Sequence, residues 1–395
     1  MVCIRLKVIL LLLILLYTGC VEEYKIPSKT VENYKEELVV QGRILSGENS
    51  VVYISKTYPF GNVEGMGEII TDAEVHIIGQ NGYESEKAVY DNLHRHYVIN
   101  TVDLPQNTLY AVEVVLNGET YQSDFQELQM SPEIDEITYK ENVDGISIHV
   151  STHDDEDGQR AYMWSCTEDW EFHSDFDFVG VSGGRVLYNK DVYPIDGWVN
   201  PYLYCWGHQE SGNIYIYSTA GLKENAVKEH ELFRIPVDDI RISYIYSILL
   251  KQWSLSDEAY NYFQTLKLYT EDTGGLFAPM PTEIDGNVSC ISNPNIKVRG
   301  YVLAATVTEK RIFIYESDFK QIRSDYQNCS WLNAQNYPGW EGAWMESMEK
   351  GNSIIFTQTG IIDQTSISYS KNCFDCRETE GASKKRPDFW PNNHE

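Results

Sequence analysis

Basic residues are scarce in this sequence. Only 31 lysines and arginines stand against 59 aspartates and glutamates, and the formal net charge at pH 7 is −28. A field of that sign repels phosphate backbones, so we expect no nucleic-acid partner. The chain is nevertheless not a disordered acidic segment, because 42% of its residues are hydrophobic and 13% are aromatic. That composition is sufficient to form substantial cores.

Long apolar runs are absent beyond the N-terminus, so no membrane-spanning helix is expected in the body of the chain. The apolar run Val8–Leu16 is shorter than the roughly 20 residues that a spanning helix needs, and it has the length of a signal-peptide core. Thr18-Gly19 lead directly into Cys20, a pattern that resembles a bacterial lipobox. We predict a leader over residues 1–19 and a lipid on the Cys20 sulfur. The alternative is an ordinary signal peptide followed by a chance cysteine.

The segment after this cysteine is polar and acidic. Residues 20–37 show no hydrophobic periodicity, which predicts a flexible tether. Glu22 and Glu23 also resemble the surface-export signal of Bacteroidota lipoproteins. We therefore expect a protein that is held by its lipid on the outer membrane and exposed at the cell surface.

Residues 38–130 consist of short alternating runs separated by turn signals. Asn81-Gly82 and Asn117-Gly118 lie between such runs, and Asn-Gly favours the type I′ turn of a tight hairpin. No segment with the period of a helix interrupts the pattern. The spacing predicts an Ig-like or transthyretin-like β-sandwich.

A second β-rich region is expected over residues 131–316, so the predicted fold class is mainly β. Strands near Ile214–Ser218 and Val298–Val307 are predicted to complete a fibronectin-like sandwich that carries a long insertion. One helix is predicted inside this insertion, with Ser256 as its N-cap and Thr273-Gly274-Gly275 at its end. Residues 317–395 form a C-terminal region rich in cysteine and tryptophan.

Six cysteines remain beside Cys3 and Cys20, an even number that indicates disulfides in an exported chain. The Cys-x-x-Cys pair near the C-terminus lacks the second ligand pair of a zinc site and the following helix of a thioredoxin-like motif. We expect structural disulfides, and the sequence leaves their pairing open. The candidates are Cys166, Cys205, Cys290, Cys329, Cys373 and Cys376.

The combination of several short motifs resembles one family. The motifs are Gln252-Trp253-Ser254-Leu255, Gly286-Asn287-Val288, Gly300-Tyr301, Lys310-Arg311-Ile312 and Pro387-Asp388-Phe389-Trp390. Together they are similar to the domain-of-unknown-function family 4249 of Bacteroidota outer-membrane lipoproteins. The resemblance implies an accessory protein of a TonB-dependent transporter, and it supplies no catalytic residue and no cofactor.

Catalytic and metal-binding motifs are weak. Gly180-Val181-Ser182-Gly183-Gly184 matches the pattern of a nucleophile elbow, which needs a strand before it and a helix after it. Arg185–Tyr188 instead has the pattern of another strand, which favours a glycine-rich hairpin. His94 and His96 lie on one face of a strand without a third ligand, and the acidic turn Asp154–Gly158 misses the EF-hand spacing. We expect a non-enzymatic protein without metal or cofactor.

Aromatic side chains near loops are the remaining candidates for contact with a ligand or partner, although such rings are often part of a β-sandwich core. The chosen candidates are Trp198, Trp206, Trp340 and Trp344. The favoured function is an accessory or substrate-binding subunit of a TonB-dependent nutrient-uptake assembly. The alternative is a stand-alone surface lipoprotein that binds a glycan or a peptide, and a hydrolase that uses Ser182 comes third.

Overall fold

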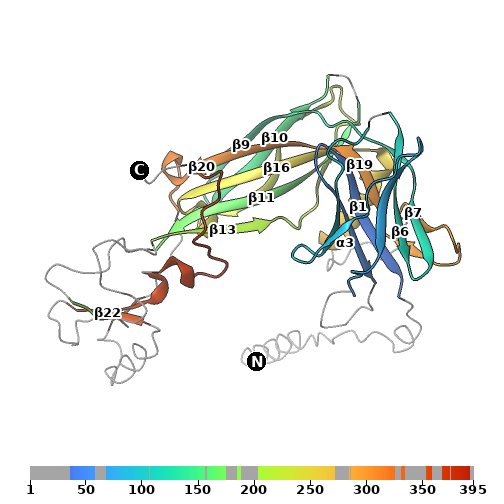
Figure 1. The fold of residues 1–395 in the computed structure, drawn as a ribbon. Coiled ribbons are helices and arrows are strands. Elements are labelled where there is room, and N and C mark those ends of the chain that lie inside the picture. The colour runs from blue at the N-terminus through green and yellow to red at the C-terminus, as the bar shows by residue number, and fades with distance from the viewer. Residues whose placement is uncertain are drawn as a thin grey trace, which may run out of the picture.

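The computed structural model describes residues 36–57, 68–105, 107–155, 158–174, 185–187, 203–271, 284, 286–324, 331–333, 353–357, 367–373 and 375–391. Within these ranges the fold is mainly β, as predicted, with two β-sandwiches and a further small sheet (Figure 1). No helix in the described ranges is long and apolar enough to cross a membrane. Several predicted site residues lie outside the described residues: Cys20, Ser182, Trp198, Cys329, Trp340 and Trp344.

The first sandwich consists of two sheets. One has the order β18 (Val298–Arg299), β1 (Leu38–Ser46), β2 (Ser50–Lys56), β5 (His96–Ile99), β4 (Val89–Asp91), and β19 (Val302–Thr306) also pairs with β1. The other has the order β17 (Val288–Cys290), β7 (Glu119–Ser123), β6 (Leu109–Leu116), β3 (Glu74–Gly79), and β8 (Gln126–Glu127) also pairs with β6.

Alternation along the strands places every second side chain in the core between these sheets. Val40 and Ile44 of β1 are fully buried there with Val75 of β3 and Val112 of β6. The predicted hairpin turn at Asn117-Gly118 is confirmed, because both residues have positive φ values, 53° and 82°. The predicted sandwich over residues 38–130 is therefore present, although other residues complete it.

Residues 288–306 belong to the first sandwich, so the prediction that Val298–Val307 completes the second sandwich is wrong. β19 pairs in parallel with β1, from Gly42 opposite Val302 to Ser46 opposite Thr306. Gly300 makes this approach possible. It has a φ of +105°, and a Cβ at this position would lie 2.0 Å from the Val40 carbonyl oxygen.

The second sandwich also has two sheets around one core. The first sheet has the order β15 (Ala226–Pro236), β10 (Gly145–His153), β9 (Ile134–Asn142). The second has the order β13 (Tyr204–Glu210), β11 (Ala161–His173), β16 (Ile245–Leu255), β20 (Thr308–Tyr315), and β14 (Tyr215–Ser218) also pairs with β11. The strand predicted near Ile214–Ser218 is thus confirmed as β14. Two short 3-10 helices, η1 (Ile240–Ile242) and η2 (Glu316–Asp318), flank the sheets.

The described part of the chain has one α-helix, α3 (Asp257–Glu271). It begins where predicted, since the backbone N–H of Ala259 donates to the Ser256 Oγ at 3.2 Å. Asp257 and Glu258 place negative charge in the first turn, near the positive end of the helix dipole, and this stabilises the helix. The helix follows β16 of the second sandwich and precedes β17 of the first. The predicted helix-containing insertion is therefore present between β16 and β20 of the second sandwich, and its strands β17 to β19 join the first sandwich.

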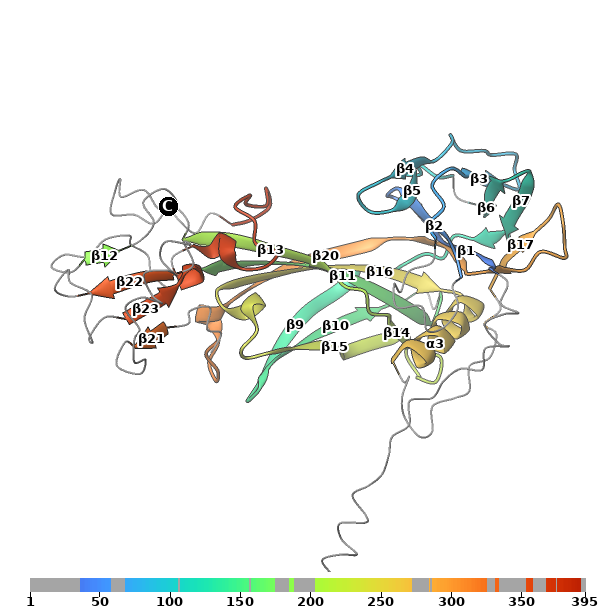
Figure 2. The ribbon, with the colours of Figure 1, turned by 90° about the horizontal axis from the view of Figure 1, so that it is seen from below.

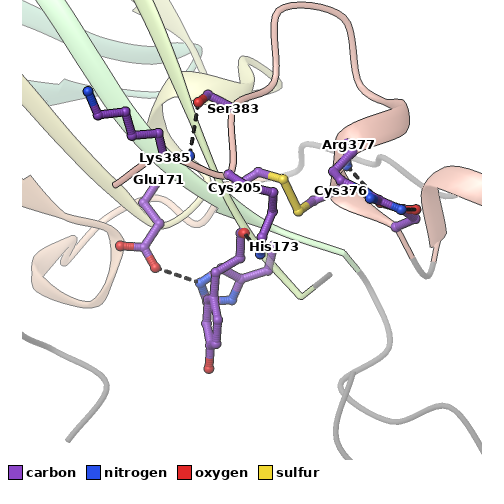
Figure 3. The surroundings of a disulfide bond; sticks show 10 residues. Glu171, His173, Cys205, Cys376, Arg377, Ser383 and Lys385 are labelled. Carbon is purple, nitrogen blue, oxygen red and sulfur yellow. Dashed lines mark hydrogen bonds and ion pairs between the residues drawn. A yellow bond between two sulfur atoms is a disulfide. The ribbon is translucent and has the colours of Figure 1, made fainter. Parts of the chain in front are cut away.

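The C-terminal segment, residues 375–391, packs on the second sandwich (Figure 2). Trp206 and Ser383 exchange two backbone hydrogen bonds of 2.8 Å. The indole N–H of Trp390 donates to the Glu171 carboxylate at 2.7 Å, and the Cys205–Cys376 disulfide fixes the segment covalently (Figure 3).

A separate four-stranded sheet has the order β12 (Arg185–Leu187), β22 (Ser353–Thr357), β23 (Ile367–Ser370), β21 (Trp331–Asn333). The 3-10 helices η4 (Lys371–Cys373) and η5 (Cys376–Glu378) follow it.

The disulfide predictions are confirmed in part. Cys205 bonds to Cys376, and Cys373 is also disulfide-bonded. Cys166 and Cys290 are free, so the prediction that they form disulfides is wrong. The physical reason is their position, because Cys166 is buried in the core of the second sandwich and Cys290 in the core of the first.

Candidate functional site

The junction between the two sandwiches is built from apolar side chains of both and of α3. Leu45, Leu303 and Ala305 lie on the outer face of the first sandwich, and Met163 and Trp253 come from the second. α3 lies beside this contact (Figure 2). We call the buried set the junction cluster; its members are Leu45, Ala161, Met163, Trp253, Leu255, Ala259, Tyr262, Tyr301, Leu303 and Ala305.

Hydrogen bonds reinforce the junction where the chain passes between the sandwiches. Ser131 donates its hydroxyl to the Thr306 carbonyl at 2.7 Å and accepts the Ser254 N–H at 2.8 Å. Gln252 Nε2 donates to the Pro132 carbonyl at 2.7 Å. An ion pair between Lys251 and Glu48 joins β16 to the β1–β2 turn. These contacts hold the two sandwiches in one orientation.

Two hollows flank the junction cluster. The larger, of about 630 Å³, lies between the β7–β8 link and the start of α3, and we call it the β8 hollow. Its walls carry three carboxylates and several side-chain amides. The residues that supply these groups are Asp124, Glu127, Glu258, Gln126, Gln129, Asn261 and Asn287.

The smaller hollow, of about 280 Å³, lies between the outer face of the β1 sheet and the second sandwich. We call it the Arg43 hollow. Arg43 and Tyr53 come from the first sandwich and Trp253 from the second, while Tyr262 and Phe263 come from α3. The Arg43 guanidinium carbon lies 5.0 Å from the centre of the Trp253 ring, a cation–π contact.

Alternation along β1 is a sequence signal for part of this site, because it places Arg43 on the face of the strand that points away from the core of the first sandwich. Trp253 belongs to a motif of the family resemblance, but nothing local in the sequence indicates that it faces Arg43. Among the predicted contact residues that the structure describes, Trp206 is 7% exposed. It packs against Ile245 and Trp390, so it is not an exposed loop ring.

Two buried carboxylates on β11, those of Glu168 and Asp169, are paired within the fold. Glu168 accepts from Arg241 at 2.8 Å and from the Tyr246 hydroxyl at 2.6 Å. Asp169 accepts from Arg311 at 3.1 Å and contacts the His208 ring at 2.7 Å. Because their oxygens are occupied in this way, these groups act as structural charges.

The surroundings of this network shift the pKa values of two members. Burial, followed by the charge of Glu168, raises the pKa of the Tyr246 hydroxyl well above its ordinary value. Burial lowers the pKa of Arg241, but its hydrogen bonds to Asp239 and the charge of Glu168 outweigh that effect and raise it overall. Both groups therefore keep their protons at physiological pH.

The histidine pair of the β4–β5 hairpin has a charge partner of its own. His94 Nδ1 lies 2.7 Å from Asp91, and this hydrogen bond lowers the pKa of the Asp91 carboxyl to about 2. His94 and His96 stack with ring centres 5.7 Å apart, and burial lowers the pKa of His96. Within the described ranges no group of three or more histidine, cysteine, aspartate or glutamate side chains is placed to hold a metal ion.

The comparisons with known proteins place this architecture in a family. The family model described as "Domain of unknown function (DUF4249)" matches residues 21–311. The chain belongs to this family. The DUF4249 match covers the first sandwich, the junction cluster, both hollows and the second sandwich as far as the first half of β20, and it ends before the C-terminal segment that carries Trp390. The comparison with curated proteins finds no match.

Proposed function

We propose that this DUF4249 protein is a lipid-anchored, non-enzymatic binding subunit of an outer-membrane uptake assembly that contains a TonB-dependent transporter. The observation that carries the proposal is the fixed junction, where two sandwiches and α3 enclose hollows lined by aromatic and polar side chains. Sites at domain interfaces are a common location for ligand binding. A preformed site also saves the entropy of ordering its walls when a ligand binds.

The anchor follows from the sequence before β1. A lipid on Cys20 and a tether that ends at Leu38 keep the sandwiches close to the membrane, because a flexible segment of this length spans on average about 2 nm. Confinement of this kind raises the effective concentration of the protein near other outer-membrane proteins. Modest contacts then suffice for a stable assembly with a transporter.

Metabolic labelling with a palmitate analogue tests the anchor, with membrane fractionation as a second readout. The Cys20→Ala variant should lose both the label and its association with the outer membrane, because the thioether needs the cysteine sulfur. The Cys3→Ala variant is the matched control, since its cysteine lies in the leader, and it should label normally. Persistent labelling of the Cys20→Ala chain would overturn the proposed anchor.

A further inference from the structure

We propose that the Arg43 hollow binds a small ligand that carries a carboxylate on an apolar or planar body. This inference rests on the proposed function, because it names the class of ligand that the binding subunit takes. It concerns one hollow and one cation. It does not depend on the lipid or on the transporter.

Arg43 differs in its surroundings from six other arginines of this chain. Six arginines in the described ranges form ion pairs with carboxylates: Arg234, Arg241, Arg299, Arg311, Arg323 and Arg377. Within those ranges Arg43 has no carboxylate at ion-pair distance, and its guanidinium lies over the Trp253 ring. In so acidic a chain, an arginine kept clear of carboxylates inside a hollow indicates a site for an external anion.

The walls of the hollow agree with this assignment. None of its lining residues is an aspartate or glutamate, whereas the β8 hollow has three such residues. The net charge of the chain does not oppose the ligand strongly, because salt screens charges beyond about 8 Å at physiological ionic strength. Asp91 is paired with His94, and neither Asp91 nor Glu210 lines the hollow.

The remaining walls favour an apolar or planar body. Tyr53, Phe263 and Tyr301 offer aromatic surface, and Leu303 adds aliphatic surface. Asn213, with neighbouring serines, supplies polar groups at the edge formed by the second sandwich. The volume of about 280 Å³ corresponds to about nine water molecules at roughly 30 Å³ each, the size of a small carboxylic acid.

Trp253 provides a second, independent observation. It is 1% exposed, and its indole N–H has no hydrogen-bond acceptor. A buried donor without an acceptor is costly, and proteins rarely keep one without a reason. A ligand oxygen at the edge of the indole ring, in the plane of its N–H bond, would satisfy this donor, while a second oxygen of the same carboxylate would accept from the guanidinium.

Calorimetric titration of the purified full-length protein tests the proposal with four probes. Phenylacetate and the tripeptide glycyl-glycyl-phenylalanine carry the carboxylate, and their neutral amides, phenylacetamide and the amidated tripeptide, are the matched controls. We expect at least one acid to bind, and each amide to bind at least tenfold more weakly than its acid. Binding of phenylacetate alone identifies a free small acid as the source of the carboxylate. Binding of the tripeptide identifies a peptide C-terminus.

Substitutions assign the binding to this hollow. Arg43→Gln should weaken binding at least tenfold, and Arg43→Lys, which keeps the charge without the planar fork, should weaken it less. Arg234→Gln, an exposed arginine on β15, is the control and should bind as the wild type does. In a ¹⁵N-correlated proton spectrum the Trp253 indole resonance should shift when the acid is added and not when its amide is added.

The outcomes separate this inference from the proposed function. Equal binding of acid and amide, unchanged binding by Arg43→Gln, or no binding by any probe at about 10 mM would each overturn the carboxylate assignment. Palmitate labelling and transporter contact do not involve Arg43, so they should persist in Arg43→Gln. Loss of labelling in Cys20→Ala, in turn, should leave carboxylate binding unchanged.

Discussion

Carboxylates dominate this chain, and at the scale of single residues the fold uses several of them as internal partners. Glu168 is 3% exposed in its side chain and is neutralised by Arg241, which is 16% exposed. A buried ion pair contributes little to the stability of the fold by itself, but removal of one member leaves the other charge buried and uncompensated. The cost of breaking such a pair therefore exceeds the gain from making it.

Arg241→Met tests this account of the buried pair. We expect the free energy of unfolding to fall by about 3–5 kcal/mol, because Glu168 stays buried without its cation. Arg234→Met removes an exposed ion pair with Glu231 and should lower the free energy of unfolding far less. Urea denaturation of both variants provides the comparison. Equal losses would show that the burial of Glu168 does not determine the effect.

The free thiol of Cys166 is expected to be inert. Burial, with the charge of Glu168 as a smaller cause, raises its pKa to about 12. Because the thiolate is the reactive form, iodoacetamide at pH 8 should leave Cys166 unmodified in the folded protein and modify it fully in urea. Mass spectrometry of the digested protein measures both states. Rapid alkylation of the native protein at Cys166 would contradict the burial described here.

At the scale of elements, β19 depends on one glycine. Gly300→Ala should destabilise the protein by about 2–4 kcal/mol, because the residue has a positive φ and its new Cβ would collide with the Val40 carbonyl. Gly118→Ala is the matched control, since Gly118 also has a positive φ but has no neighbour within 4 Å. Its cost should be about 1 kcal/mol. If chemical denaturation shows that both variants lose a similar amount of stability, the close approach of β1 and β19 is not the cause of the Gly300→Ala effect.

The sequence predicts some elements well and others not at all, for physical reasons. Alternation in β1 and the Asn117-Gly118 turn are local signals, and so is the Ser256 cap of α3. β19 has no such signal for its partner, because it is apolar on both faces. Val302 and Ala304 face the core of the first sandwich, and its intervening residues face the junction. An apolar run of this kind could belong to either sandwich, and its pairing with β1 places it in the first.

The candidate site was beyond prediction for the same reason. The Arg43 hollow joins β1, β2, α3 and β16, which are up to about 220 residues apart in the chain, so no spacing in the sequence reveals it. The disulfides show the same limit. The even number of cysteines indicated bonds, but only the folded cores show that Cys166 and Cys290 have no partner within reach.

At the scale of the whole molecule, the described body is two sandwiches held rigidly at one junction, with a C-terminal segment fixed to the second by the Cys205–Cys376 bond. The two hollows keep their shape only while that orientation is kept. In the function that we propose, the junction forms a fixed surface that faces the transporter. In the same proposal, the tether over residues 20–37 keeps that surface near the membrane.

The central claim is that the protein assembles with a TonB-dependent transporter. Mild-detergent purification of the tagged protein at native expression tests it most directly. Wild-type protein should bring down a β-barrel TonB-dependent transporter, and Cys20→Ala, which loses the confinement, should bring down much less. Trp340→Ala and Trp344→Ala should weaken the contact, because both rings are predicted partner contacts. Recovery of the protein alone from several detergents would contradict the account and would support a stand-alone binding lipoprotein instead.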